Sequence, residues 1–220
     1  PPQRVVELSR GKAYVQIGYI GFEQVWMEKL QANCKDMKVF DTSQGVDLIR
    51  ARGHWHGDHF HEGGVEPHIW NSTKNVSVIA ENICQALCEL DADHQEYYKH
   101  RTDSLKQLIE LTDKEIRSSL QKADSTFLIY HPALSYFARD YGLKQISIEK
   151  DGKEPSTNQL KELIETCRKE NAHVIFVQQE FDKRNAQLIA DELGVSVVSV
   201  NPLSYDWNEE MLHVAKALKR

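Results

Sequence analysis

The sequence lacks a long hydrophobic run, a dense set of cysteines and an excess of positive charge. No stretch of about 18 apolar residues occurs, so the sequence predicts no transmembrane helix. The four cysteines, Cys34, Cys84, Cys88 and Cys167, are too few and too scattered for a disulfide scaffold. The net charge of −6 argues against a protein that binds nucleic acid by electrostatic attraction.

The 220-residue chain has the composition of an ordinary globular protein. Hydrophobic residues make up 40% and charged residues 27%, which argues against a disordered chain. The length is sufficient for one large domain or two smaller lobes. The chain begins Pro1-Pro2-Gln3, without a methionine or a hydrophobic targeting segment. We therefore expect a processed or trimmed product whose targeting segment has been removed.

Strand and helix patterns alternate from the beginning of the chain. Short apolar runs predict strands over 13–17 and 37–41. Between them, helical spacing predicts a helix over 22–31 with Trp26 and Leu30 facing inward.

Two longer helical patterns follow. Residues 71–73 read Asn-Ser-Thr, which are favoured N-cap residues, and they precede a helical apolar pattern that continues to residue 91. A second pattern runs from 93 to 122. At about 1.5 Å per residue, this second helix would be roughly 40 Å long, which is enough to connect two lobes.

The second half of the chain alternates short strands with helices. The predicted strands cover 126–130, 145–148, 174–177 and 195–200, and the predicted helices cover 135–141, 159–169, 185–192 and 209–219. Such alternation is typical of right-handed crossover units in a mostly parallel sheet. Gly142 and Gly194 stand where helices should end.

These patterns predict an α/β fold with two lobes, each a mostly parallel sheet flanked by helices, joined by one long rigid helix. We expect an N-terminal lobe over 1–92 with a histidine-rich loop over 53–65, a connecting helix over 93–123 and a C-terminal lobe over 124–220. The first lobe offers fewer strands than the second. We therefore expect it to be incomplete, with a strand-helix-strand unit missing in front of Pro1.

Histidine is unusually concentrated in one part of the chain. Of ten histidines, five fall within fifteen positions: His54, His56, His59, His61 and His68. The surrounding segment, 45–65, is polar and glycine-containing and has no sustained period, which predicts a loop.

Residues 54–59 read H-x-H-x-D-H, which resembles the zinc motif of metallo-β-lactamase-fold hydrolases. That motif follows directly on an apolar strand, whereas residues 47–53 are mixed and basic here. The hydrolase fold also needs a downstream glycine-flanked histidine and a bridging aspartate, and nothing after His68 matches them. A zinc hydrolase is therefore kept only as an alternative.

His131 directly follows the predicted strand 126–130. Ligands of open α/β sheets collect outside the carboxyl ends of the strands, so His131 stands where a binding site is expected. His68 stands at a turn beside Pro67. We expect imidazoles from opposite lobes to meet in a cleft.

Two motifs around these histidines resemble those of a known family. Residues 66–70 read Glu66-Pro67-His68-Ile69-Trp70 and resemble D-P-H-x-W. The segment 130–143 resembles H-x-x-x-x-Y-F-x-x-x-Y-G-L and contains Tyr130-His131-Pro132, Tyr136-Phe137-Ala138 and Tyr141-Gly142-Leu143. The chain is similar, over essentially its whole length, to the metal-binding solute-binding proteins of ABC importers. Within that cluster A-I group, it resembles members of the high-affinity zinc uptake kind.

The resemblance implies a set of metal ligands. His68 and His131 match two ligands of the family, and the family's first histidine is expected upstream of residue 1. Manganese members tend to have glutamate where His131 stands, and imidazole suits Zn²⁺ better than Mn²⁺. Asn201 stands where the family often has aspartate, and Asp206 lies close by in the sequence. Both are weaker candidates, Asp206 being equally well explained as a helix N-cap.

The resemblance also implies a function. We expect an extracytoplasmic, monomeric protein, periplasmic or lipid-anchored, that captures Zn²⁺ between its lobes and delivers it to an ABC permease without catalysis. The loop histidines His54, His56, His59 and His61 would form an accessory metal-binding element. The alternatives are the zinc hydrolase and a manganese-binding or adhesin-type member of the same family.

Overall fold

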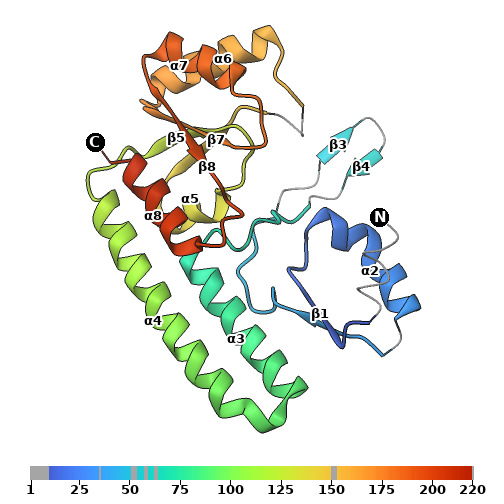
Figure 1. Ribbon diagram of the computed structural model, residues 1–220. Helices are drawn as coiled ribbons and strands as arrows, with labels where there is room; N and C mark the ends of the chain where they lie inside the picture. The colour runs from blue at the N-terminus through green and yellow to red at the C-terminus, as the bar shows by residue number, and fades with distance from the viewer. Residues whose placement is uncertain are drawn as a thin grey trace. The chain divides into compact units, whose positions relative to one another are not determined.

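The computed structural model describes residues 10–34, 36–50, 54–56, 59–61, 64–149 and 153–219, with the backbone alone described over 54–56 and 59–61. The chain divides into two compact units (Figure 1). Unit 1 comprises Pro1–Trp70 and Lys74–Gln107, and unit 2 comprises Asn71–Thr73 and Leu108–Arg220. The predicted boundaries at residues 92 and 123 stay a prediction.

Unit 1 contains a small parallel sheet and one helix packed against it. Strand β1 (Ala13–Gln16) pairs in parallel with β2 (Lys38–Asp41), and α2 (Gly21–Asn33) lies between them in the chain. The core of this part consists of Met27, Leu30, Cys34 and Met37, with Tyr14 and Val39 packed against it. The predicted strands and helix are confirmed.

The inward face of α2 differs from the prediction. Leu30 is buried, but Trp26 is 47% exposed, and Lys29 Nζ lies 5.2 Å from the centre of its ring. The buried positions of α2 are Glu23, Met27 and Leu30. The Glu23 carboxylate accepts hydrogen bonds from the backbone N–H groups of Ile17 and Gly18. The buried face of α2 therefore includes Met27 in place of its neighbour Trp26.

The histidine-rich segment contains a hairpin where the sequence predicted a loop. β3 (His54–His56) pairs antiparallel with β4 (His59–His61), in the register His54↔His61 and His56↔His59. The bridge Arg50↔Val65 keeps the same register. The prediction of a loop is wrong for these strands, because two residues separate them and two-residue connections favour antiparallel pairing.

Two long helices follow. α3 (Thr73–Leu90) is joined through the short 3-10 helix η1 (Ala92–His94) to α4 (Gln95–Leu120). The expected long helix over 93–122 is thus confirmed, and at about 1.5 Å per residue its 26 residues span roughly 39 Å. Among the described helices, none carries an apolar stretch that could cross a membrane.

Unit 2 is built around a four-stranded parallel sheet in the order β6-β5-β7-β8. Its elements alternate along the chain as predicted: β5 (Thr126–Ile129), α5 (Ser135–Tyr141), β6 (Lys144–Ser147), α6 (Thr157–Lys169), β7 (Val174–Gln178), α7 (Arg184–Leu193), β8 (Ser196–Val200) and α8 (Trp207–Ala217). Every residue of β5 and β7 is buried, as expected for central strands covered on both faces.

Helices cover both faces of this sheet (Figure 1). One core cluster joins the sheet to the end of α4, α5 and α8, and includes Ile116, Phe137 and Met211. A second cluster joins the opposite face to α6 and α7, and includes Cys167 and Ile189. Because helices pack on both faces of the sheet, the strand ends of unit 2 have fixed positions relative to one another.

A polar cluster lies where α4 and α5 meet the first residue of α3. The Asp113 carboxylate accepts hydrogen bonds from Thr73 Oγ1 at 2.9 Å, Tyr141 OH at 2.7 Å and Arg117 Nε at 2.7 Å. Burial alone would raise the pKa of Asp113, but the hydrogen bonds from Arg117, Tyr141 and Thr73 outweigh it and lower this pKa. Burial also raises the pKa of the Tyr141 hydroxyl, which keeps it a donor.

The lowered pKa of Asp113 predicts a specific acid sensitivity. Its carboxylate stabilises the fold above the unfolded-state pKa of about 3.9, and this contribution is lost as the pH falls through the lower folded-state pKa. Urea unfolding followed by circular dichroism gives the free energy of unfolding at each pH. This free energy should fall less steeply at acid pH for Asp113→Asn than for the wild type. Asp103→Asn, on an exposed position of the same helix, is the control. An equally steep fall of the free energy of unfolding in the wild type and in Asp113→Asn would contradict the stabilising role of the Asp113 carboxylate.

Candidate metal-binding site

Four polar side chains follow the carboxyl ends of the four strands of unit 2. His131 comes two residues after β5, Glu149 two residues after β6, Gln178 ends β7, and Asn201 directly follows β8. Because all four strands are parallel, these residues stand at one edge of the sheet. This edge is where α/β folds bind their ligands.

His131 is held along its ring edge and its backbone. Its Nδ1 atom lies 2.6 Å from Oε1 of Glu149, a carboxylate whose side chain is only 8% exposed. Gln178, itself buried, donates from Nε2 to the His131 carbonyl at 2.7 Å and accepts from the His131 N–H at 3.3 Å. The residue is therefore fixed by two side chains from the neighbouring strands β6 and β7.

An aromatic ring fixes the face of the His131 imidazole. Phe181, from the segment after β7, stacks on it with 5.7 Å between ring centres and 23° between planes. Phe181 also stacks on Tyr130, with 4.9 Å between centres. Burial, followed by the charge of Glu154, raises the pKa of Tyr130, so its hydroxyl stays neutral. The orientation of His131 is thus set before any ligand arrives.

His68, in unit 1, has a closely similar environment. Its Nδ1 contacts Oε1 of Glu66, and the same oxygen accepts the His68 backbone N–H at 3.1 Å. The two side chains are 16% and 18% exposed. Trp70 packs edge-on against the imidazole, with 5.4 Å between ring centres. Glu66 therefore orients His68 much as Glu149 orients His131.

A carboxylate on one imidazole nitrogen is a common feature of metal-binding histidines. It fixes the tautomer and ring orientation and raises the basicity of the other nitrogen, Nε2, toward a metal. The sequence interpretation selected His68 and His131 but assigned no role to Glu149 or Gln178, and it used Glu66 only as part of a motif. The position of Glu149, two residues after a strand as His131 is, was a signal that could have identified it.

The weaker sequence candidates lie at the β8–α8 connection. Asn201 Oδ1 accepts a hydrogen bond from the backbone N–H of Leu203 at 3.2 Å. Asp206 is exposed at the N-cap position of α8, without a side-chain capping hydrogen bond. Within the part of the chain that the structure describes, no three His, Cys, Asp or Glu residues form a set that could hold a metal. Among the candidate ligands in the described residues, His68 and His131 each pair with a carboxylate, that of Glu66 and that of Glu149. The side chains of His54, His56, His59 and His61 lie outside the described atoms.

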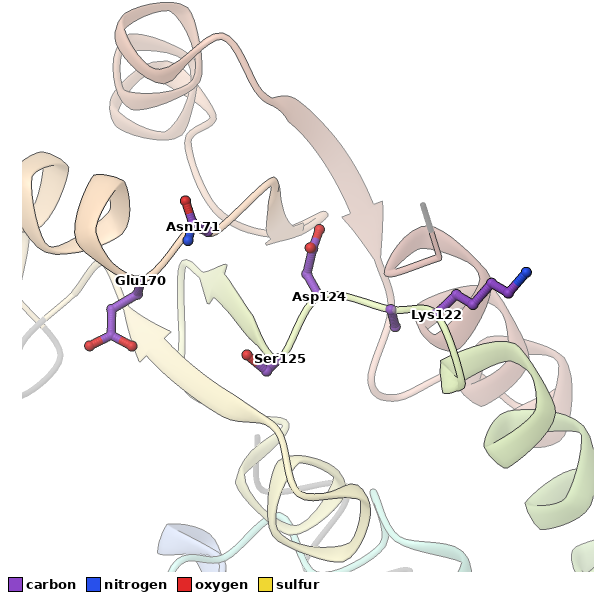
Figure 2. A pocket seen from close by; sticks show the side chains of 6 residues that line it. Lys122, Asp124, Ser125, Glu170 and Asn171 are labelled. Atoms are coloured by element: carbon purple, nitrogen blue, oxygen red, sulfur yellow. The ribbon is translucent and has the colours of Figure 1, made fainter.

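A pocket of about 410 Å³ lies near the opposite, amino-terminal edge of the same sheet (Figure 2). It is lined by Lys122, Ala123, Asp124, Ser125, Glu170 and Asn171. Figure 2 shows the carboxylates of Asp124 and Glu170 pointing in different directions, and Glu170 pairs with Lys144 Nζ at 2.6 Å. This pocket therefore has no convergent ligand set and is distinct from the edge that carries His131.

Comparison with known proteins gives a family match over the whole chain. Residues 1–220 match the family model described as "Zinc-uptake complex component A periplasmic" (ZnuA). A solved structure of a ZnuA deletion mutant with zinc bound has a TM-score of 0.87 and 36% identity to this chain. That similarity covers 100% of this chain and 84% of the other.

Two curated relatives match across most of this chain. The high-affinity zinc uptake system protein ZnuA of Bacillus subtilis is 29% identical over 171 residues, 74% of this chain and 54% of that protein. The zinc-binding lipoprotein AdcA of Streptococcus pneumoniae is 27% identical over 190 residues, 82% of this chain and 38% of that protein. The chain thus spans about half or less of the length of these two relatives.

The contact with Glu149 predicts the tautomer of His131. An ionised carboxylate only accepts hydrogen bonds, so the neutral imidazole must carry its proton on Nδ1. His213 is an internal control, because its Nε2 lies 3.0 Å from the carbonyl oxygen of Ser199 and must donate there. Long-range ¹H–¹⁵N NMR of the metal-free chain should find these opposite tautomers, and Glu149→Ala should remove the Nδ1–H preference of His131. An Nε2–H tautomer of His131 in the wild type would contradict the geometry.

Proposed function

We propose that this chain, which belongs to the zinc-uptake complex component A family, captures a zinc ion outside the cytoplasm and delivers it to an ABC permease. The observation that carries the proposal is the repeated pairing of a histidine with a carboxylate, His68 with Glu66 and His131 with Glu149. The zinc-bound structure of a ZnuA deletion mutant with 36% identity supports zinc as the cargo. The role is capture and release of the ion, with no bond made or broken in a substrate.

The ligand chemistry supports zinc over manganese. Imidazole nitrogen is a favourable donor for Zn²⁺, whereas Mn²⁺ prefers carboxylate, carbonyl and water oxygens. In the proposed site, Nε2 of His68 and Nε2 of His131 bind the ion, while Glu66 and Glu149 stay on the Nδ1 atoms. Asn201 and Asp206 are weaker candidates for further ligands.

The histidine hairpin has a proposed accessory role. Residues two apart in a strand stand on the same face, so the register of β3 and β4 puts the positions of His54, His56, His59 and His61 on one face of the hairpin. We assign to them weak or transient zinc binding. This assignment is independent of the tight site.

Zinc titration of the metal-free chain by calorimetry tests the proposal. The wild type should bind one zinc ion tightly, and His131→Ala or His68→Ala should each weaken binding by more than about 100-fold, since even loss of an outer hydrogen-bonding partner typically costs 10–100-fold. His94→Ala is the matched control. His94 has the same Nδ1-carboxylate pairing, with Asp91 at 2.9 Å, but its side chain is 67% exposed at the α3–α4 corner.

Deletion of residues 53–62 separates the accessory sites from the tight one. The deletion should remove any weak zinc equivalents and leave the tight equivalent in place. Absence of tight binding in the wild type, or tight binding that survives both histidine substitutions, would disprove the proposed function. Loss of tight binding on deletion of the hairpin would move the site away from His68 and His131.

A further inference from the structure

Three consecutive side chains, of the two residues before α3 and of its first residue, form hydrogen bonds within unit 2. Asn71 Nδ2 donates to the Ala133 carbonyl at 2.9 Å. Ser72 Oγ donates to Asp140, and Thr73 Oγ1 donates to Asp113 at 2.9 Å. All three residues are at most 5% exposed. The chain therefore enters unit 2 through a short, buried and fully polar segment.

The hydrogen bond of Asn71 is made to the turn that carries His131. The Ala133 N–H donates to the His131 carbonyl at 2.7 Å, and Gln178 donates to that same carbonyl at 2.7 Å. Asn71 and Gln178 thus hold the turn at two points two residues apart. Removal of the Asn71 amide would leave the carbonyl of the buried Ala133 without this donor. Of the two points, the one at the His131 carbonyl would then remain.

The same residue is close to His68 along the chain. Only Ile69 and Trp70 separate His68 from Asn71, and Ile69 is fully buried. The Ile69 carbonyl accepts a hydrogen bond from Asn75 Nδ2 at 3.0 Å, one turn into α3. The short segment after His68 is therefore held at both of its ends.

The side-chain oxygen of Asn71 also indicates that the amide is kept for its hydrogen bond to Ala133. Its Oδ1 is buried and, among the described residues, has no hydrogen-bond partner. A buried acceptor without a donor destabilises a fold, and an apolar side chain would avoid that cost. An apolar side chain would also lose the bond to Ala133, which explains why an amide stands at this position.

We propose that Asn71, three residues after His68 in the chain, is a positioning residue for zinc: its amide fixes the turn that carries His131. The inference rests on the proposed function, because it needs His131 to bind the ion. Asn71 does not bind the metal itself. Its amide holds the turn that carries His131 in place before the ion arrives, so less ordering is needed on binding.

The test compares Asn71→Ala with Asn82→Ala in the full chain. Asn82 is a matched control, because its Nδ2 donates to two backbone carbonyls, of Thr42 and Gln44, both at 2.8 Å within unit 1. Three quantities are measured: zinc affinity by competition with a chelator, the absorption spectrum of the Co²⁺-substituted chain, and the metal-free melting temperature. The Co²⁺ spectrum reports the coordination geometry, which a loss of stability alone does not alter.

Asn71→Ala should weaken zinc binding about 10–100-fold and change the Co²⁺ spectrum, with both histidines still present. Asn82→Ala should lower the melting temperature and leave affinity and spectrum as in the wild type. If Asn71→Ala does not fold, Asn71→Ser is judged by the same two criteria. The inference about Asn71 is wrong if its variant keeps wild-type zinc affinity and Co²⁺ spectrum, or if the Asn82 variant loses as much affinity. Neither result would contradict the proposed function. A wild type without tight zinc binding would overturn the proposed function, and the inference with it.

Discussion

The hydrogen bond between Glu149 and Nδ1 of His131 is the interaction on which the proposed site depends. A carboxylate only 8% exposed needs a partner, because an unpaired buried charge is strongly destabilising. The bond forms because β5 and β6 are adjacent parallel strands in which Ile129 pairs with Ser147. His131 and Glu149, each two residues further along, therefore stand side by side. The fold thereby orients the imidazole without help from a metal.

The fold of unit 2 could be predicted almost completely from the sequence, because its central strands are continuous apolar runs bounded by clear helix signals. Gly142 and Gly194 were correctly expected to end α5 and α7, and both have a φ of +68°, where glycine is favoured. Unit 1 was harder. Trp26 looked like a core residue by its character, but the buried positions of α2 are Glu23, Met27 and Leu30, and the Glu23 carboxylate binds two backbone amides.

The candidate site was predictable in part. His131 could be located from the strand end alone, and His68 from its motif. Their partners depend on sheet order, since β5 lies between β6 and β7 and the chain does not reveal which strands become neighbours. Gln178 reaches His131 across 47 residues of sequence, and Asn71 reaches Ala133 across 62, so neither contact leaves a local pattern. The histidine hairpin was missed because the segment 45–65 is polar and glycine-containing and has no sustained period, which predicted a loop.

Locating the ion itself tests the central claim most directly. Crystals of the chain grown with one equivalent of zinc, measured at the zinc absorption edge, give an anomalous difference map in which the metal is identified by its own scattering. The account predicts one dominant peak, about 2.0–2.1 Å from Nε2 of His68 and from Nε2 of His131, with Glu66 and Glu149 still on the Nδ1 atoms. A dominant peak that lacks either histidine, or that is bound through Nδ1, would contradict it.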